Sequence, residues 1–354
     1  MNSPINNVDI ERLRTFEFNS VLSDSDKIHA NDIATPSPYA LCSHNCDYWD
    51  TNTFSKFLSS DNNRFNSFLH LNIQGLDAKF DEFKTFLNTL TSHSNANLPN
   101  VIALSETWLN ESNYDAFSIP GYEPIISDYR KDNSSRGGIS LFIKEGIDFI
   151  ERKDLNIFIP TIFESLFITV KSCNLTVGVI YRTPDSNRNE FLAQYIETIQ
   201  TLCQTNQPFL LLGDYNLNLL NYSREASVTD FVDATFEHGC VPLITKPTRV
   251  TPTSATCIDN IISSNIFKNS FSGILIEDVS DHFPVIYCYP KELCRSNSQY
   301  SANSSNSWNL CKDNLQKLYK MLDEHDWSEM LHETNPNIAA TRLNKTISNF
   351  LDLA

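Results

Sequence analysis

Seven polar side chains that could act together on a phosphate ester lie at the ends of apolar segments or just after them. Asp214 follows the run FLLLG and Glu106 follows VIALS, so each carboxylate lies where a buried strand would end. A carboxylate in that place is costly unless another group offsets its charge. The other members of the set are Asn72, Asn216, Asp259, Asp281 and His282. These residue types supply the oxygen ligands, the base for water and the phosphate donor that metal-assisted hydrolysis of a phosphodiester requires.

Taken singly, each of these residues has a commoner structural explanation. An aspartate at the end of a strand is usually a cap or a turn residue, and a single histidine is more often hydrogen-bonded within a core than catalytic. The whole set is harder to explain in this way, because the strands of one sandwich deliver their ends to one rim. We therefore expect the seven side chains to converge.

The segment VSDHFPVIY contains the most specific pair, Asp281 and His282. Neighbouring side chains of an extended backbone point to opposite sides, so these two must have different partners. His282 beside a phosphate would need a buried acid to fix its tautomer and to favour the imidazolium. Asp259 lies within the apolar run CIDNII and has no other evident role. The sequence therefore predicts an Asp259–His282 pair.

The elements that would position these residues are short apolar strands, rich in β-branched and aromatic residues, that begin near Phe68. Apolar residues at spacings of three and four predict helices over 77–90 and 187–203, the second with Asp185 or Ser186 as its N-cap. A shorter helix is predicted over 227–237. Many strands with a few helices around them favour an α+β sandwich of two sheets with helices outside.

The composition is that of a globular protein, with 354 residues, 41% apolar residues and 20% charged residues. No apolar run approaches the roughly 18 residues of a membrane span, and the first residues lack the apolar stretch of a signal peptide. Nine cysteines, mostly inside apolar runs, indicate reduced thiols in an intracellular protein. Cys42, His44 and Cys46 in CSHNC leave a zinc site open, but four ligands at structural spacing are absent.

The net charge of −16 argues against a protein that merely coats DNA. Any function on nucleic acid must therefore depend on a bound cation and on local basic groups. Arg136 and Arg182 are the best local candidates for contacts with backbone phosphates.

The chain divides by composition into four parts. Residues 1–64 are rich in Asn, Ser and Asp and are expected to be loosely ordered, apart from a short helix around 53–58. The strands and helices described above fill residues 65–292. A polar linker is expected over 293–308, and residues 309–354 form a helical segment with helices near 309–324 and 337–351.

Seven short motifs in order resemble the endonuclease/exonuclease/phosphatase superfamily: LNIQGL, ALSETWL, RGGISLF, GVIYRTP, LLGDYNLN, TCIDNI and SDHFPV. Within it, the resemblance is closest to the apurinic-type endonuclease domain of LINE-type non-LTR retrotransposon proteins, and it covers about residues 65–290. The segments before and after this part also resemble flanks of such elements. The helical segment 309–354 would then be a truncated lead-in to a reverse transcriptase.

The resemblance implies a four-layer α/β/β/α sandwich and a hydrolase that depends on Mg²⁺, with Mn²⁺ as an alternative. On the metal side, Glu106 would be the principal ligand, Asn72 would help to hold the metal, and Asp281 would support it, often through water. Cellular apurinic endonucleases of the superfamily usually have an acidic ligand where this chain has Gln74. Retroelement members often have a neutral residue there, so Gln74 fits that subgroup and weakens the case for repair of abasic sites.

On the phosphate side, the resemblance implies that Tyr181 donates to the scissile phosphate and that Asp214 orients or deprotonates the attacking water. Asn216 would lie beside Asp214 on the phosphate. His282 would contact the phosphate while paired with Asp259. The motif SRGG at 135–138 also resembles the retroelement pattern, although two glycines explain a tight turn equally well.

The resemblance also implies a substrate and a setting. The protein would nick double-stranded DNA in the nucleus and leave a 3′-hydroxyl primer for reverse transcription of element RNA by a missing polymerase portion. Two alternatives remain open: a catalytically idle or domesticated remnant that only binds, and another phosphoesterase of the superfamily. The signature of inositol polyphosphate 5-phosphatases is missing, because TSATCIDNI occupies its place.

Overall fold

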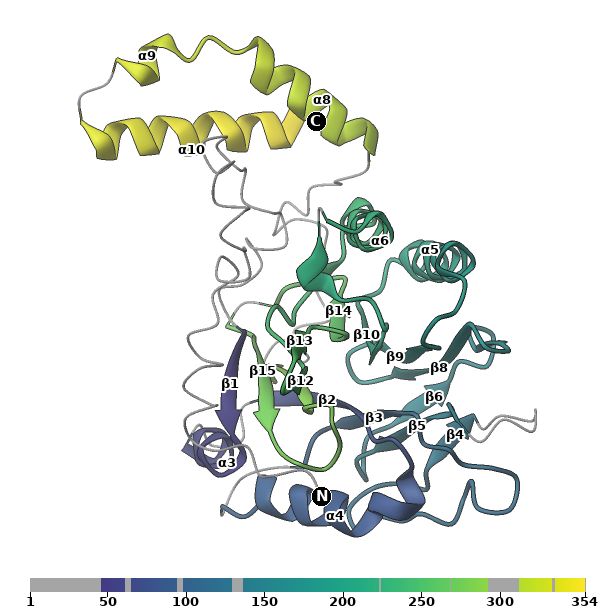
Figure 1. Cartoon of the computed structure of the whole chain (residues 1–354). Coiled ribbons are helices and arrows are strands. Elements are labelled where there is room, and N and C mark those ends of the chain that lie inside the picture. Colours follow the sequence, from purple (N-terminus) through teal and green to yellow (C-terminus); the bar gives the residue numbers. More distant parts are fainter. Residues whose placement is uncertain are drawn as a thin grey trace.

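Two mixed β-sheets face each other and form the centre of the molecule (Figure 1). The computed structural model describes residues 46–60, 65–93, 98–128, 136–222, 224–267, 269–291, 312–332 and 335–353. In order across the first sheet, the strands are β1 (Cys46–Asp50), β15 (Phe271–Ile276), β16 (Val285–Pro290), β2 (Phe65–Asn72), β3 (Val101–Ser105), β5 (Ile139–Ile143) and β4 (Ile126–Asp128). Both parallel and antiparallel pairs occur in this sheet.

The second sheet has the same number of strands. In order, they are β11 (Val241–Pro242), β14 (Asp259–Ser263), β10 (Phe209–Asp214), β9 (Leu175–Arg182), β8 (Phe163–Val170) and β6 (Phe149–Glu151), with β7 (Ile157–Ile159) also paired to β8. A separate hairpin joins β12 (Arg249–Thr251) to β13 (Ser254–Thr256).

Helices cover the outer faces of both sheets (Figure 1). The helices α3 (Thr51–Ser60) and α4 (Leu76–Leu90) pack on the first sheet, and α5 (Arg188–Gln204) and α6 (Ala226–Glu237) pack on the second. A single 3₁₀ turn, η4 (Leu219–Asn221), precedes α6. This arrangement confirms the predicted four-layer α/β/β/α sandwich.

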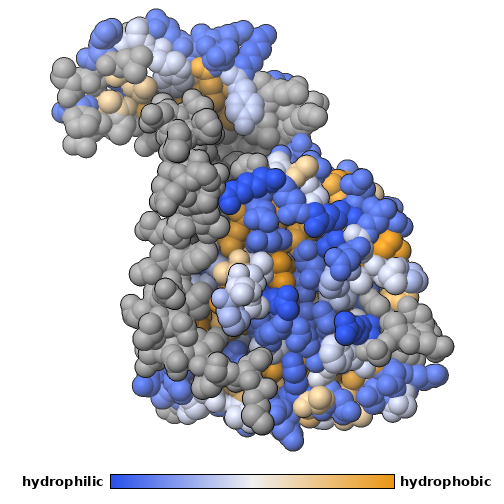
Figure 2. All heavy atoms as spheres, in the orientation of Figure 1, coloured by the Kyte–Doolittle hydropathy of each residue, from blue (hydrophilic) through white to orange (hydrophobic). Residues whose placement is uncertain are grey.

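The burial of the central strands explains why the sequence reads as unbroken apolar runs. Every residue of β8, β9 and β10 is buried, because one face packs on the first sheet and the other on α5 and α6. Strands covered on both faces lose the alternation of apolar and polar residues. Phe191 and Tyr195 of α5 and Phe231 of α6 complete this core. On the face shown in Figure 2, the coloured residues are mainly hydrophilic, with smaller hydrophobic areas between them.

The pairing of the strands brings the ends of several of them to one edge. β10 runs parallel to β9, with Asp214 opposite Tyr181, and antiparallel to β14, with Asp214 also opposite Asp259. In the first sheet, β2 runs parallel to β3 and Asn72 lies opposite Ser105, the residue before Glu106. The positions singled out in the sequence therefore lie at the same edge of the sandwich.

Two boundaries differ from those predicted. β1 pairs in parallel with β15, and Phe54 and Leu58 of α3 enter the core, so the folded domain begins before residue 65. The segment 1–64 was expected to be loosely ordered, but the short helix predicted around 53–58 lies within α3. The N-cap of α5 is Asn187 rather than Asp185 or Ser186, since its side chain accepts from the backbone of the first turn. Residues 1–45 and the predicted linker 293–308 lie outside the described residues.

The C-terminal part contains the helices α8 (Lys312–Glu324), α9 (Ser328–Leu331) and α10 (Pro336–Leu353), which contact one another. The first and last of these lie where helices are predicted from the sequence. Across the described parts of the chain, none of the helices combines the length and the apolar character that a membrane crossing requires.

Gly213, directly before Asp214, lies where β9 and β10 approach each other closely, and a substitution there can test this approach. A Cβ at this position would lie 2.0 Å from the carbonyl oxygen of Ile180, a backbone atom that cannot rotate away. We expect Gly213→Ala to lower the free energy of unfolding by about 3 kcal/mol. Urea denaturation of the purified protein measures this loss.

Gly146→Ala is the matched control. Gly146 has φ +81° but no atom near its missing Cβ, so only the strain of the left-handed conformation remains, about 1 kcal/mol. Equal losses in the two variants would contradict a close approach of the strands at Gly213.

Candidate active site

Asn72, at the end of β2, joins two carboxylates from different sheets. Its Nδ2 donates to Glu106 Oε1 at 2.9 Å and to Asp214 Oδ2 at 2.8 Å. These two oxygens therefore lie within 5.7 Å of each other, the sum of the two bond lengths. Asn72 and Asp214 are fully buried, and Glu106 is half-buried. A single cation with a bridging water or phosphate can reach both carboxylates at this separation.

The orientation of the Asn72 amide differs from that of a metal ligand. Asn72 Oδ1 accepts from the backbone N–H of Gln74 at 3.2 Å, so the amide nitrogen faces the two acids. As an oxygen ligand, Asn72 would have to rotate its amide and leave this bond. In this structure Asn72 instead acts as a hydrogen-bond donor that offsets the charge of Glu106 and Asp214.

Asp214 is the least compensated acid of the site. Asn216 N donates to its Oδ1 at 2.9 Å, and Asn72 occupies its Oδ2. Burial, and after it the charge of Asp259, raise the pKa of Asp214 to about 7. Two neutral amide donors are weak compensation for a buried carboxylate, so a bound cation is the natural partner here.

Asp259 and His282 form the predicted pair. His282 Nδ1 lies 2.8 Å from Asp259 Oδ2, and Thr248 Oγ1 donates to the same oxygen at 2.7 Å. All three residues are buried. Burial is the largest single effect and would lower the pKa of His282, but the charge and hydrogen bond of Asp259, together with the charges of Asp214 and Asp281, outweigh burial and raise the pKa to about 9. The imidazole is therefore held as an imidazolium, with its tautomer and orientation fixed by the acid.

A second buried histidine, His70 of β2, was missed in the sequence. Its Nδ1 lies 3.8 Å from Asp259 Oδ1, and neither atom has a hydrogen-bond partner. Its Nε2 contacts Ser105 Oγ at 3.2 Å. Burial lowers the pKa of His70 to about 4, so this ring is neutral. The polar residue within the apolar run FLHLN was the available signal.

The loop that bears Glu106 is fixed by another missed residue, Glu164 of β8. Glu164 is buried, and its Oε2 accepts from Gly138 N at 2.8 Å. Gly138 O in turn accepts from Thr107 N at 3.1 Å. Gly137 and Gly138 have φ values of 91° and 84°, so these two glycines adopt a backbone conformation that glycine favours. A glutamate that opens the apolar run ESLFITV was the signal for this contact.

Ser280 joins the two halves of the site and was also missed. Its Oγ donates to Asn72 O at 2.6 Å and accepts from His282 N at 3.1 Å. The backbone of the Asn72 turn is thereby tied to the segment that presents His282.

Of the predicted phosphate ligands, Tyr181 lies at the site and Arg182 does not face it. Burial, followed by the charges of Glu106 and Asp214, raises the pKa of Tyr181, so its phenol keeps its proton. Arg182 is buried and donates to the carbonyl oxygens of Asn216 and Ser186. Its guanidinium therefore holds the loop after Asp214, which is at odds with a contact to a backbone phosphate. Alternating residues of a strand point to opposite faces, and Arg182 follows Tyr181.

Asp281 forms an ion pair with Arg249 of the same chain. Arg249, at the start of the hairpin, donates to Asp281 Oδ2 through Nε at 2.8 Å and through a terminal nitrogen at 2.6 Å. Asp281 Oδ1 is buried without a hydrogen-bond partner and lies 3.8 Å from His282 Nε2. Lys79 of α4 is half-buried near Asp281 and Glu106, whose charges act on its pKa, although burial has the larger effect and lowers it. Arg136 is exposed.

The acids fit a hard divalent cation. Asp214, Asp259 and His282 each offer one ligand atom, and these atoms lie within 4.8 Å of one another. Asp259 and His282 already bond each other, however, and Mg²⁺ prefers oxygen ligands to imidazole. Glu106 and Asp214 are the pair with oxygen ligands and incompletely offset charge. Mg²⁺ therefore fits between these two better than between Asp259 and His282.

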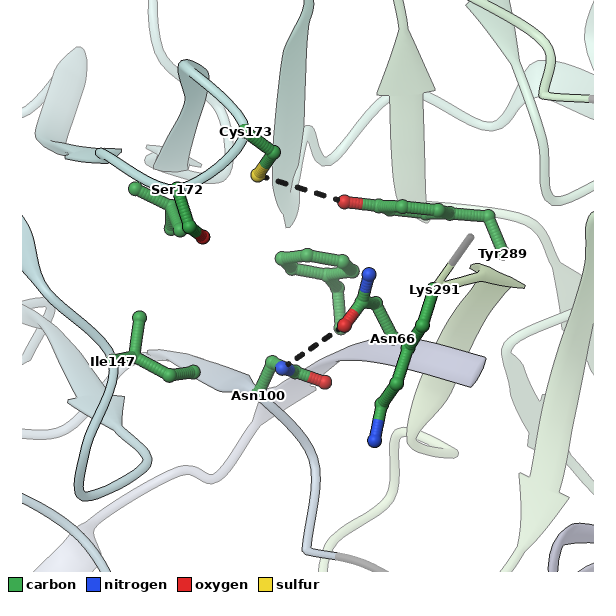
Figure 3. A pocket seen from close by; sticks show the side chains of 9 residues that line it. Asn66, Asn100, Ile147, Ser172, Cys173, Tyr289 and Lys291 are labelled. Atoms are coloured by element: carbon green, nitrogen blue, oxygen red, sulfur yellow. Dashed lines mark hydrogen bonds between the residues drawn. The ribbon is translucent and has the colours of Figure 1, made fainter. Parts of the chain in front are cut away.

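A cavity of about 500 Å³ lies at the other end of the sandwich (Figure 3). Asn66 and Asn100 of the first sheet line it on one side, and Cys173 lies near Tyr289 on the other. Asn66 is the second residue of β2, which ends at Asn72, so the cavity is about 20 Å from the carboxylates. The candidate active site is thus a rim of polar side chains rather than a part of this cavity.

Several solved structures are similar to this chain. The AP endonuclease LMAP from Leishmania major matches with a TM-score of 0.50 and 14% identity over 64% of this chain and 88% of that one. The endonuclease domain of TRAS1, a telomere-specific non-LTR retrotransposon, matches with 0.47 and 14% over 64% and 98%. The 3′-5′ exonuclease NExo from Neisseria meningitidis matches with 0.45 and 15% over 62% and 98%. The similarity to LMAP, at 14% identity, concerns the fold alone.

Comparison of the sequence with curated proteins gave no match. Comparison with protein families matched the Endonuclease/Exonuclease/phosphatase family over residues 69–282, which is more than half of the chain. That range begins within β2, just before Asn72, and ends at His282, so it encloses both halves of the site. The fold, the converging acids and this match lead to one conclusion: the chain belongs to the Endonuclease/Exonuclease/phosphatase family and has the site of a phosphoesterase.

Proposed function

We propose that this protein is a Mg²⁺-dependent endonuclease that nicks double-stranded DNA, as the endonuclease of a non-LTR retrotransposon, and leaves a 3′-hydroxyl primer. The observation that carries the proposal is the Asn72 bridge between Glu106 and Asp214 beside the buried Asp259–His282 pair. It combines a place for one cation, a base and a phosphate donor within one rim.

Each residue of the site has a defined task in this reaction. Asp214, whose pKa burial raises to about 7, is suited to take a proton from the attacking water near neutral pH. Burial lowers the pKa of His282, but Asp259, with smaller effects from Asp214 and Asp281, raises it to about 9, so the ring offers a charged donor to the phosphate oxygen. Tyr181 adds a protonated phenol. Asn216 keeps Asp214 oriented through its backbone N–H.

Glu106 would hold Mg²⁺, and Asp214 lies close enough to reach it through a bridging water. When bound, the cation supplies positive charge against the developing charge of the phosphate. Asp281 is available for support through its Oδ1, which has no hydrogen-bond partner.

DNA as the substrate is supported by the sequence rather than by the fold. The seven motifs occur in the retroelement order, and Gln74 has the neutral character found in that subgroup. The net charge of −16 requires local cations, and Lys79 and Arg136 lie near the Glu106 loop. A remnant that only binds and a phosphoesterase for another substrate are the outcomes that the experiments below must separate.

The first test removes the metal ligand. We expect Glu106→Gln to lower the rate of supercoiled plasmid nicking in Mg²⁺ by at least about 10²-fold, because the cation loses a charged oxygen ligand. Glu111→Gln, an exposed glutamate further along the same loop, is the control and should nick like the wild type. EDTA should abolish nicking in all of them.

Wild-type protein that binds Mg²⁺ but nicks no plasmid would contradict the proposal. If it then releases phosphate from inositol phosphates, it is another phosphoesterase of the family. If it hydrolyses neither substrate, it is a catalytically idle remnant.

The second test changes the partner of His282. Asp259→Asn keeps the shape of the side chain but removes its charge, so the effect of burial should prevail and the pKa of His282 should fall from about 9 to below 6.5. We expect nicking at pH 7.5 to fall by about 10²-fold or more, because His282 is then neutral. NMR titration of the imidazole and the nicking rate measure the two effects.

Asp148→Asn removes an exposed acid that pairs with Lys171 far from the site, and it should change neither quantity. The melting temperature of Asp259→Asn should stay near that of the wild type, whereas Asp259→Ala should melt lower because it leaves His282 and Thr248 unpaired. Near-normal nicking by a folded Asp259→Asn would show that Asp259 does not serve His282 in catalysis.

A further inference from the structure

Trp108 is a large aromatic side chain held in an unfavourable backbone conformation two residues after Glu106. Its φ is +55°, and 40% of the residue is exposed. Glu106 and Gln74, on the same pair of loops, also have left-handed φ values of 51° and 49°. Each such residue costs about 1–2 kcal/mol, so the surrounding structure must maintain the arrangement.

The surrounding backbone fixes the position of the indole. Gly75 N donates to Glu106 O at 2.8 Å, and Trp108 N donates to Gly137 O at 2.8 Å. A Cβ on Gly75 would lie 2.7 Å from Trp108 Cε3, so only glycine lets the ring lie against this backbone. Three short segments, around residues 75, 107 and 137, therefore hold Trp108 in place.

Simple packing does not explain this placement. The next residue, Leu109, is 4% exposed and belongs to the core below α4, whereas Trp108 leaves a large part of its ring in solvent. A strained backbone that presents an aromatic surface beside the principal acid of a site indicates a contact with substrate.

The groups around Trp108 fit a nucleotide. Glu106 and Asp214 lie where the proposed scissile phosphate binds, and the half-buried Lys79 places a cation near Glu106 and Asp281. A base attached to a phosphate chain can stack on an aromatic ring while its phosphates contact such groups. This stacking contributes about 1–3 kcal/mol per base and tolerates any sequence.

We propose that the exposed surface of Trp108 is a subsite for one nucleobase of the strand being cut, unstacked from its neighbours and next to the scissile phosphate. The inference rests on the proposed function and adds a specific contact to it. A substrate without a base, such as an inositol phosphate, gains nothing from this subsite.

The test combines changes in the protein with changes in the DNA. In duplexes with a single nick site, a tetrahydrofuran residue replaces one nucleotide at a time around the scissile bond. We expect one position at which loss of the base raises KM by about 5- to 150-fold, the range that corresponds to the stacking energy. Trp108→Leu should show the same rise with intact DNA and no additional rise when that base is missing. Trp108→Phe should stay within about threefold of the wild type.

Fluorescence gives a second readout that does not depend on how well Trp108→Leu folds. A mixed-sequence single-stranded oligonucleotide, added in Ca²⁺, should quench the tryptophan emission of the wild type. The same oligonucleotide should bind Trp108→Phe with similar affinity, measured by anisotropy of a labelled strand, without that quenching. Trp49, which lies against Gly273 in the first sheet, is present in both proteins.

The outcomes separate this inference from the proposed function. Nicking that depends on no single base, or losses from Trp108→Leu and from base removal that add at every position, would overturn the subsite alone. Quenching by the oligonucleotide without any nicking by the wild type would overturn the nicking function and retain the subsite. Absence of both would overturn both.

Discussion

The burial of two carboxylates opposite each other, Asp214 on β10 and Asp259 on β14, is the constraint on which the rest of the site depends. The negative charge of each carboxylate disfavours ionisation of the other. Asp259 is stabilised by His282 and Thr248, and these contacts hold its pKa below its usual range in spite of burial. Asp214 accepts hydrogen bonds from neutral amides, and although the charge of His282 opposes the shift, burial and the charge of Asp259 raise its pKa. Asp259 is therefore paired with the imidazolium of His282, whereas Asp214 can still interact with a bound cation or with water.

The loops around this pair are organised to keep polar groups in place without filling the rim. Glu106, Gln74 and Asn216 all have left-handed φ values, although none of them is a glycine. Their strain persists because strand ends and backbone bonds on both sides determine the path of the chain. Arg182 also stabilises this loop, because its guanidinium donates a hydrogen bond to the carbonyl oxygen of Asn216. A cation used in this way cannot serve a substrate, but it fixes the residue that orients Asp214.

Much of this arrangement could be predicted from the sequence because strand ends are visible there. Apolar runs that stop at Asn72 or Asp214 indicate both a strand and its end, and an acid in an apolar run such as Asp259 indicates a buried partner. His70, Glu164 and Ser280 could not be placed in this way. Their partners lie at sequence distances that only the pairing of the sheets determines. The predicted contact of Arg182 with a phosphate was wrong. A basic residue near a site suggests phosphate binding, but the alternation of side chains along β9 determines which face of the sheet Arg182 occupies.

The overall charge gives a reason for the way in which the site is built. A protein with a net charge of −16 repels a polyanion at long range, so binding must come from short-range contacts, which salt screens less than long-range attraction. A bound divalent cation between Glu106 and Asp214, a buried imidazolium at His282 and an aromatic surface at Trp108 are contacts of this kind. The Arg249–Asp281 ion pair has a related effect, because an arginine held by an acid contributes little net field to an approaching strand. Selection among phosphodiesters would then depend on the fit at the rim rather than on attraction from a distance, which suits an enzyme that must cut few positions among many.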